Sequence, residues 1–212
     1  MKTKAHQRYK TKDGTIVPGV TTITGILDKP ALIYWAWDLG MKGIDYKKFK
    51  DDKADIGTLA HDMIICHLLG TTPNLDDYTK NQIGQAENAL ISFFEWENGK
   101  NIQVIHAEKA LVSEEFKYGG QFDILAVIDG ISTLLDIKTG KAIYPEMVIQ
   151  LAAYDQLINE QINGVVKSAK ILRVGRDETE GFDVRDFTDK LTPAWRIFKH
   201  LLGIYQLRKE LQ

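Results

Sequence analysis

Apolar side chains recur at two different spacings along the chain, and the spacing predicts which segments are helices. In residues 57–69, the isoleucines and leucines at 64, 65, 68 and 69 form one apolar stripe with a helical period. Gly70, followed closely by a proline, is typical of a helix end. The same criteria predict helices over residues 31–42, 78–98, 145–161 and 190–211. The charged stretch 47–53, in contrast, is expected to be a mobile link.

Two apolar runs, 124–128 and 131–135, are separated by Asp129-Gly130, and this arrangement predicts a β-hairpin. An Asp-Gly pair favours a two-residue type I′ turn, because both turn positions need a positive φ. Further strands are expected over residues 104–112, 167–174 and 180–187, and a short hairpin is expected over residues 7–17.

The expected order is helices, three strands, a helix, two strands and a final helix. This order predicts an α/β (α+β) fold in which helices flank a central mixed β-sheet. A length of 212 residues favours a single domain over residues 1–212. We divide it into an N-terminal hairpin and helix subregion (1–56), a core (57–175) and a C-terminal strand and helix (176–212).

Composition restricts the classes of partner and cofactor. With 27 basic and 29 acidic residues, the net charge of −2 gives no overall attraction to nucleic acid, so such binding would need a local basic patch. Cys66 is the single cysteine, which excludes a disulfide framework and a cysteine-ligated iron–sulfur cluster. The polar N-terminus and the lack of a long apolar run predict a cytoplasmic protein that does not span a membrane.

The predicted hairpin turn also determines which side chains face each other. If residue 128 pairs with residue 131, counting back along both strands places Asp123 opposite Asp136. Lys138, two residues further on, projects from the same face as Asp136. Two facing carboxylates repel each other unless one is protonated or a cation lies between them. The pattern therefore predicts a divalent-metal site with a lysine beside it.

Five motifs follow one another along the chain. They are residues 57–61 (GTLAH), Glu108, 119–123 (GGQFD), 136–140 (DIKTG) and 150–154 (QLAAY). Their order and spacing resemble the PD-(D/E)xK nuclease superfamily, and within it the RecB-like exonucleases, which implies a restriction-endonuclease-like core. The likeness covers residues 57–175. Residues 18–23 (PGVTTI), with two tryptophans downstream, are similar to phage-encoded members and to the mitochondrial genome maintenance exonuclease.

The resemblance implies roles for the facing acids and their neighbours. Asp123 and Asp136 would bind Mg²⁺ or Mn²⁺, with the carbonyl of Ile137 as a further ligand. Lys138 would orient the attacking water or help to deprotonate it, and would offset charge in the transition state.

Other motif residues have both a functional and a structural interpretation. His61 matches an additional metal ligand of the superfamily, although a lone helix histidine is more often structural. Glu108 matches a catalytic acid, but it could equally be an exposed strand residue paired with a lysine. Gln150 and Tyr154 share one helix face, which in the superfamily contacts the nucleic-acid strand, or they could be helix packing.

Three further residues are candidates for nucleic-acid contacts. Thr139 follows the lysine of the central motif and would lie beside the bound strand. Trp35 and Trp37 could stack on unpaired bases, or they could pack in the core or at its rim.

The resemblance implies a metal-dependent deoxyribonuclease, namely an exonuclease that acts on DNA ends, preferably single-stranded, in phage or bacterial recombination, repair or replication. DNA is the expected partner, together with a recombination or replication protein. Two alternatives stay open: a structure-specific or restriction-type endonuclease, and a catalytically silent nucleic-acid-binding subunit. The intact Asp123, Asp136 and Lys138 speak against a silent subunit, because an unneeded pair of facing acids would reduce stability.

Overall fold

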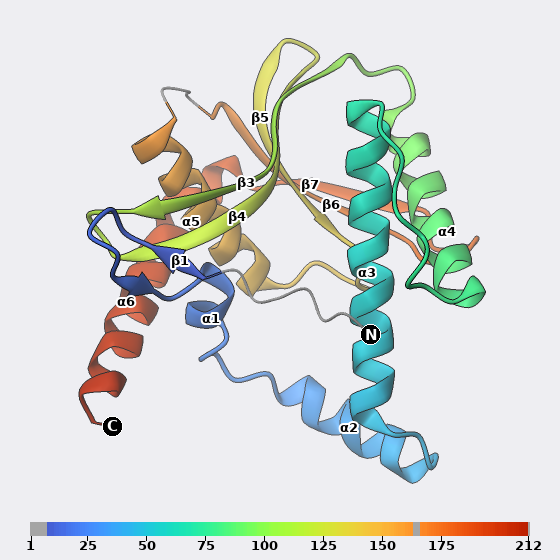
Figure 1. Cartoon of the computed structure of the whole chain (residues 1–212), viewed down its shortest axis with the longest axis horizontal. Helices are drawn as coiled ribbons and strands as arrows, with labels where there is room; N and C mark the ends of the chain where they lie inside the picture. The colour runs from blue at the N-terminus through green and yellow to red at the C-terminus, as the bar shows by residue number, and fades with distance from the viewer. Residues whose placement is uncertain (1–7, 163–165, 212) are drawn as a thin grey trace.

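A five-stranded mixed β-sheet in the order β3-β4-β5-β6-β7 forms the centre of the computed structural model (Figure 1). Residues 8–162 and 166–211 are described. The strands are β3 (Ile102–Ser113), β4 (Tyr118–Ile128), β5 (Ile131–Lys138), β6 (Ser168–Val174) and β7 (Phe182–Asp186). Neighbouring strands are antiparallel except β5 and β6, which are parallel and are joined through helix α5 (Pro145–Gln161).

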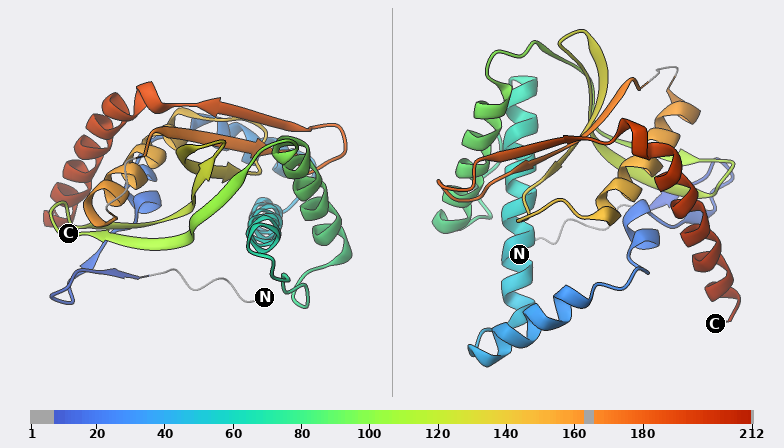
Figure 2. Two further views of the ribbon diagram at one scale, coloured as in Figure 1. Left: turned by 90° about the horizontal axis from the view of Figure 1, so that it is seen from above. Right: turned by 180° about the vertical axis from the view of Figure 1, so that it is seen from behind.

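Helices cover both faces of this sheet. On one face, α3 (Tyr46–Leu69) and α4 (Lys80–Glu97) pack on a core that includes Leu135 and Ile137. On the other face, α1 (Val20–Thr24), α5 and α6 (Leu191–Glu210) pack on a core that includes Leu134. Figure 2 shows the two groups of helices well apart. The predicted fold class, a mixed α/β fold with a helix-flanked central sheet, is confirmed.

The remaining elements are short. A two-stranded hairpin of β1 (Tyr9–Lys10) and β2 (Ile16–Val17) confirms the hairpin predicted near the N-terminus. Helix α2 (Pro30–Met41) precedes α3, and a single 3₁₀ turn, η1 (Thr188–Lys190), precedes α6. Within the described residues, no helix combines the length and the apolar composition needed to cross a bilayer.

The β4–β5 hairpin has the predicted turn. Asp129 and Gly130 have φ values of 50° and 82°, as a type I′ turn requires. Ile128 pairs with Ile131, and the register continues without a shift to Ile124 and Leu135. The predicted register of this hairpin is therefore confirmed over its whole ladder.

The prediction of a mobile link over residues 47–53 was wrong, because α3 already begins at Tyr46. The side chain of Asp45 caps this helix by accepting a hydrogen bond from the Lys48 N–H at 3.0 Å. Polar residues of the stretch then bind α4, where the Lys53 ammonium donates to the Gln85 side chain at 2.8 Å. The polar side chains of residues 47–53 thus help to hold α3 against α4. A hydrophobicity pattern does not detect contacts of this kind.

Strands β4 and β5 separate beyond Ile124 and Leu135, and we call this point the fork. Past the fork, β4 continues to pair with β3 as far as Tyr118, while β5 continues to pair with β6 as far as Lys138. Figure 1 shows β3 and β4 curving to one side while β5 and β6 run to the other. The next residues on the two diverging strands are Asp123 and Asp136.

Two adjacent glycines of β4 make room for aromatic rings near the fork. A Cβ on Gly119 would overlap the ring of Tyr9, and the Gly119 N–H donates to the Pro18 carbonyl at 2.9 Å. A Cβ on Gly120 would lie 2.8 Å from the ring of Tyr154. The GGQFD motif therefore has a packing function, because it lets the N-terminal hairpin and α5 approach the same strand.

We predict that Gly119→Ala destabilises the protein by about 1–3 kcal/mol, since the new methyl group must displace the ring of Tyr9. Gly84→Ala is the matched control, because a Cβ on this α4 residue meets no atom within 4 Å. This control should raise stability by up to about 1 kcal/mol through helix propensity. Urea unfolding followed by circular dichroism measures both changes, and equal stabilities of the two variants would refute the packing account.

Candidate metal centre at the fork of strands β4 and β5

Asp136 is the most deeply buried charged residue of the candidate site, with 1% of its surface exposed. Its Oδ2 atom lies 2.6 Å from the Lys138 ammonium nitrogen, which forms an ion pair. Apart from this contact with Lys138, neither carboxylate oxygen has a hydrogen-bond partner among the described residues. Buried oxygens of this kind are rare, because desolvation of an unsatisfied carboxylate is costly.

Asp123, on the opposite branch of the fork, contacts both β5 and α3. Its Oδ2 atom accepts a hydrogen bond from the Ile137 N–H at 2.7 Å, in the place where a strand partner would otherwise pair. Its Oδ1 atom lies 3.7 Å from Nδ1 of His61, which α3 contributes from its middle. The fork thus brings together the facing acids, Lys138 and His61, as the sequence motifs predicted.

The electrostatics of the two carboxylates and the lysine are coupled. Burial raises the pKa of Asp136 to about 6, with repulsion from Asp123 adding to it and attraction to Lys138 and His61 opposing it. Burial by itself would lower the pKa of Lys138, but the charges of Asp136 and Asp123 outweigh burial and raise it. The lysine is therefore a stable cation, whereas for Asp136 the cost of burial outweighs the attraction to its cationic neighbours.

Glu108 occupies a strained position on β3. On either side of it in the strand, Ala107 pairs with Ile124 and Lys109 pairs with Phe122. Glu108 therefore lies level with Asp123 in the sheet. Its φ of 45° is in the left-handed region, which is unfavourable for a residue with a side chain. Strain of this kind costs on the order of 1–3 kcal/mol and is concentrated at functional sites.

Near this strained position, the side chains of β4 switch from one hydrophobic core to the core on the other face of the sheet. Phe122 packs into the core with α5 and α6, whereas Ile124, two residues later, packs into the core with α3 and α4. Regular alternation would put both side chains on the same face. The sheet is therefore locally twisted at Asp123, and this twist accompanies the separation of β4 from β5.

Helix α5 places its two motif residues differently. Tyr154 is 7% exposed, and burial, followed by the negative charges of Asp136 and Asp123, raises the pKa of its phenol well above the usual range. Its hydroxyl therefore belongs to the acidic site. The Gln150 amide instead donates to the Thr24 hydroxyl of α1 at 3.1 Å. No sequence motif had indicated Thr24, because only the fold brings α1 beside α5.

The other predicted nucleic-acid contacts are spread over two regions. Thr139 lies at the end of β5 against α3, where a Cβ on Gly57 would be 3.0 Å from its hydroxyl. Trp35 packs edge-on against Tyr46, with ring centres 5.2 Å apart, which is the packing alternative for this residue. Trp37 exposes 67% of its surface on α2. Of the three residues, Thr139 alone adjoins the fork.

A group of cations next to Thr139 had no sequence signal, because its members come from three separate segments. The pKa of Lys53 is lowered by burial and by the positive charges of Arg176 and Lys141. The Arg176 guanidinium donates to the Lys53 carbonyl at 3.2 Å. Asp52 and Glu180 partly offset the three positive charges. Together these five side chains carry a net charge of +1, from Lys53, Lys141 and Arg176 against Asp52 and Glu180.

The side chains at the fork fit a divalent cation with few protein ligands. Among the described residues, no group of three or more His, Cys, Asp and Glu side chains has the arrangement of a metal cage. Mg²⁺, however, is usually held by only one or two carboxylates and keeps several waters. The unsatisfied oxygens of Asp136, opposite Asp123, provide hard oxygen donors of this type.

Comparison with known proteins leaves the family of the chain open. No protein-family model matches the sequence, and no curated protein matches it. Two solved structures share parts of the fold. A candidate exonuclease from Eubacterium rectale has a TM-score of 0.42 and 14% identity over 85% of this chain and 69% of its own. An alkaline exonuclease from Laribacter hongkongensis has a TM-score of 0.35 and 13% identity over 74% of this chain and 90% of its own.

Proposed function

We propose that this chain is a metal-dependent nuclease that hydrolyses phosphodiester bonds in DNA. The observation that carries the proposal is the buried Asp136, whose oxygens have no partner among the described residues apart from the ammonium of Lys138, and whose pKa burial nevertheless raises to about 6. Such an arrangement reduces the stability of the fold by itself. A hard divalent cation between Asp123 and Asp136 would remove the penalty and would equip the site for phosphoryl chemistry.

Asp123 and Asp136 would hold the cation, with the Ile137 carbonyl and His61 as further ligands. Oxygen donors suit Mg²⁺, and an added imidazole would extend the range to Mn²⁺. The bound ion would supply positive charge that polarises a phosphoryl oxygen and makes a nearby water more acidic. The Ile137 N–H keeps Asp123 oriented for this role, since it occupies Oδ2 and leaves Oδ1 directed toward His61.

Lys138 would act as a charged hydrogen-bond donor rather than as a base. Its raised pKa keeps it protonated at neutral pH. A charged ammonium donates hydrogen bonds, so it would orient the attacking water and stabilise the negative charge that builds up on the phosphoryl oxygens. The buried carboxylate of Asp136 fixes its position at 2.6 Å.

Glu108 would supply a third acidic group at the same level of the sheet as Asp123. Its left-handed backbone conformation is unfavourable, so the surrounding strands must stabilise it. We assign it to positioning of the attacking water or of the metal ligands. Tyr154, within electrostatic range of both carboxylates, would donate a hydrogen bond from its hydroxyl to a substrate oxygen, because its raised pKa keeps it protonated.

The substrate strand would pass over the basic group of Lys53, Lys141 and Arg176. Lys141 follows Thr139 by two residues, and Lys53 lies on α3 one helical turn before Gly57, which approaches Thr139. Phosphate oxygens bind such groups without regard to sequence, which suits an enzyme that degrades DNA. Trp37 could stack on an unpaired base at the outer end of the path, because most of its ring is exposed.

The finer assignment is an exonuclease that acts on DNA ends, with single strands preferred, in recombination, repair or replication. Its support is the resemblance of the five sequence motifs to RecB-like exonucleases, together with a net charge that disfavours tracking along duplex DNA. A structure-specific endonuclease is the alternative with the same chemistry.

We predict that Asp136→Ala and Lys138→Ala each lower the cleavage rate by at least about 10²–10³-fold while the fold is retained. The assay uses end-labelled linear strands, circular single strands and duplex DNA with Mg²⁺, Mn²⁺ or EDTA. Lys80→Ala, an exposed residue at the start of α4, is the matched control and should cleave at the wild-type rate. Degradation of linear but not circular DNA supports the exonuclease, nicking of circles supports the endonuclease, and full activity of both site variants refutes the assigned centre.

We predict that Lys141→Gln weakens binding of single-stranded DNA and reduces the slope of log K against log salt by about 0.7, because one phosphate contact is lost. Fluorescence anisotropy in EDTA, measured at several salt concentrations, separates binding from cleavage. Lys80→Gln should leave the slope unchanged. If the two variants have the same slope, the basic group does not contact the backbone.

A further inference from the structure

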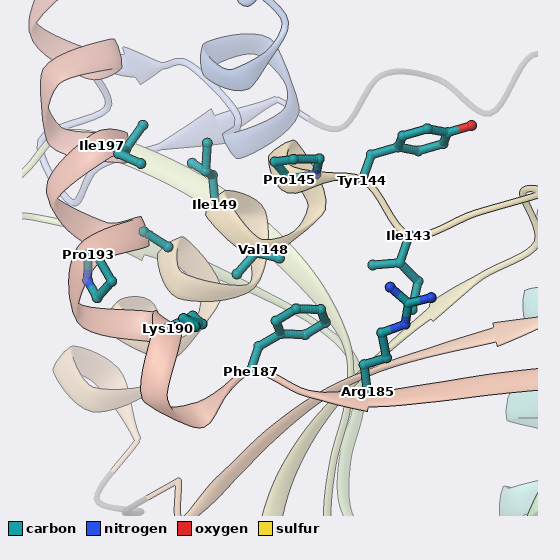
Figure 3. Close-up of a pocket in the computed structure, with 11 residues that line it drawn as sticks. Ile143, Tyr144, Pro145, Val148, Ile149, Arg185, Phe187, Lys190, Pro193 and Ile197 are labelled. Carbon is teal, nitrogen blue, oxygen red and sulfur yellow. The ribbon is translucent and has the colours of Figure 1, made fainter.

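A largely apolar pocket of about 410 Å³ opens between the start of α5, the end of β7 and the start of α6 (Figure 3). Its walls are mostly aliphatic: Val148 and Ile149 come from α5, and Pro193 and Ile197 come from α6. Phe187, which follows β7, closes one side. The pocket has the size and chemistry to take one or two apolar side chains, and the proposed nuclease chemistry does not use it.

Apolar surface remains exposed around this pocket. Ile197 and Tyr144, which both line it, each leave 46% of their surface accessible. Exposed apolar side chains that gather around a concavity, with polar groups at its rim, are typical of interaction sites. Covering them with a partner would stabilise a complex by roughly 25 cal/mol for each Å² of apolar area buried.

Positive charge surrounds the mouth of the pocket. Lys190 and Arg185 both line it, and both are exposed. Arg185 is paired with Asp183 at 2.8 Å, so part of its charge is offset. The nearest acid of α5, Glu146, is itself paired with Lys29 at 3.4 Å. Among the residues that line the pocket, Lys190 and Arg185 carry charge and none is acidic, so the lining itself favours an anionic neighbour.

The apolar walls of the pocket favour an apolar side chain over a nucleobase. A nucleobase would bring several hydrogen-bonding groups into a pocket whose walls are hydrocarbon, and each unsatisfied group costs about 1–3 kcal/mol. An aliphatic or aromatic side chain has no such groups, and acidic neighbours in the same segment would meet Lys190 and Arg185. The combination therefore favours a protein segment over a nucleic acid.

We propose that this pocket docks an acidic segment of a partner protein through one apolar anchor side chain. The anchor would fill the space between Ile149 and Ile197, while carboxylates beside it contact Lys190 and the free face of Arg185. Ile149 lines the pocket on α5, and the same helix carries Tyr154, whose pKa is raised in part by the charges of Asp136 and Asp123. Docking would therefore bring the partner next to the candidate active site without occupying it.

Fluorescence anisotropy on the full-length protein, in EDTA, tests this proposal. The probe is a labelled six-residue peptide of aspartates and serines that ends in phenylalanine, and its control ends in serine instead. We expect saturable binding of the first peptide with Kd below about 300 µM, and binding of the control weaker by at least about tenfold. The readout does not require cleavage, so its failure is distinct from failure of the proposed nuclease function.

Two substitutions at equally exposed positions of α6 locate the binding. Ile197→Glu places a carboxylate in the pocket and should weaken peptide binding at least about tenfold. Ile204→Glu is the matched control, because Ile204 is 48% exposed and does not line the pocket. Circular dichroism confirms that both variants fold.

Three results would overturn the proposal. The first is no saturable binding of the phenylalanine peptide up to about 1 mM. The second is equal weakening by Ile197→Glu and Ile204→Glu, which would place the peptide elsewhere. The third is loss of oligonucleotide binding in Ile197→Glu alone, without any effect on the peptide, which would make the pocket a nucleic-acid subsite.

Discussion

The separation of strands β4 and β5 is the constraint on which the candidate site depends. Because β4 stays with β3 and β5 stays with β6, the ladder between them ends at Ile124 and Leu135, and the next residue on each strand is an aspartate. Asp136 is held in the apolar interior, where the cores on the two faces of the sheet exclude water from it. Desolvation makes its charge expensive, and this cost makes a cation at the fork favourable.

Packing at a distance from the acids maintains this geometry. Gly119 and Gly120 let the rings of Tyr9 and Tyr154 lie directly on the backbone of β4, so the N-terminal hairpin and α5 converge on the strand that carries Asp123. On the opposite face, α3 approaches so closely that Gly57 meets Thr139 and His61 reaches Asp123. These contacts bring sequence motifs that are far apart in the chain together at the fork.

Local patterns predicted the elements and the acid pair because those features depend on short-range rules. The Asp129-Gly130 turn allows only one register, so counting along the hairpin brings residues 123 and 136 to the same level, although the ladder ends one pair earlier, at Ile124 and Leu135, and the two acids are not a ladder pair. Features that depend on tertiary contacts were missed. The start of α3 at Tyr46 needs the Asp45 cap and contacts to α4, and the strained backbone of Glu108 reflects its place beside Asp123. The apolar pocket combines the start of α5 with the end of β7 and the start of α6, which are far apart in the sequence, and it has no motif.

Titration of the wild-type protein with Mn²⁺ by isothermal calorimetry tests the central claim most directly, because it measures the fork without requiring a substrate. The account predicts saturable binding that Asp136→Asn abolishes. Asp155→Asn is the control, since Asp155 is a carboxylate of the same helix as Tyr154 that bonds to Asn159 instead of facing the fork, and it should retain the wild-type affinity. Equal Mn²⁺ affinity in the wild type and Asp136→Asn would contradict the account.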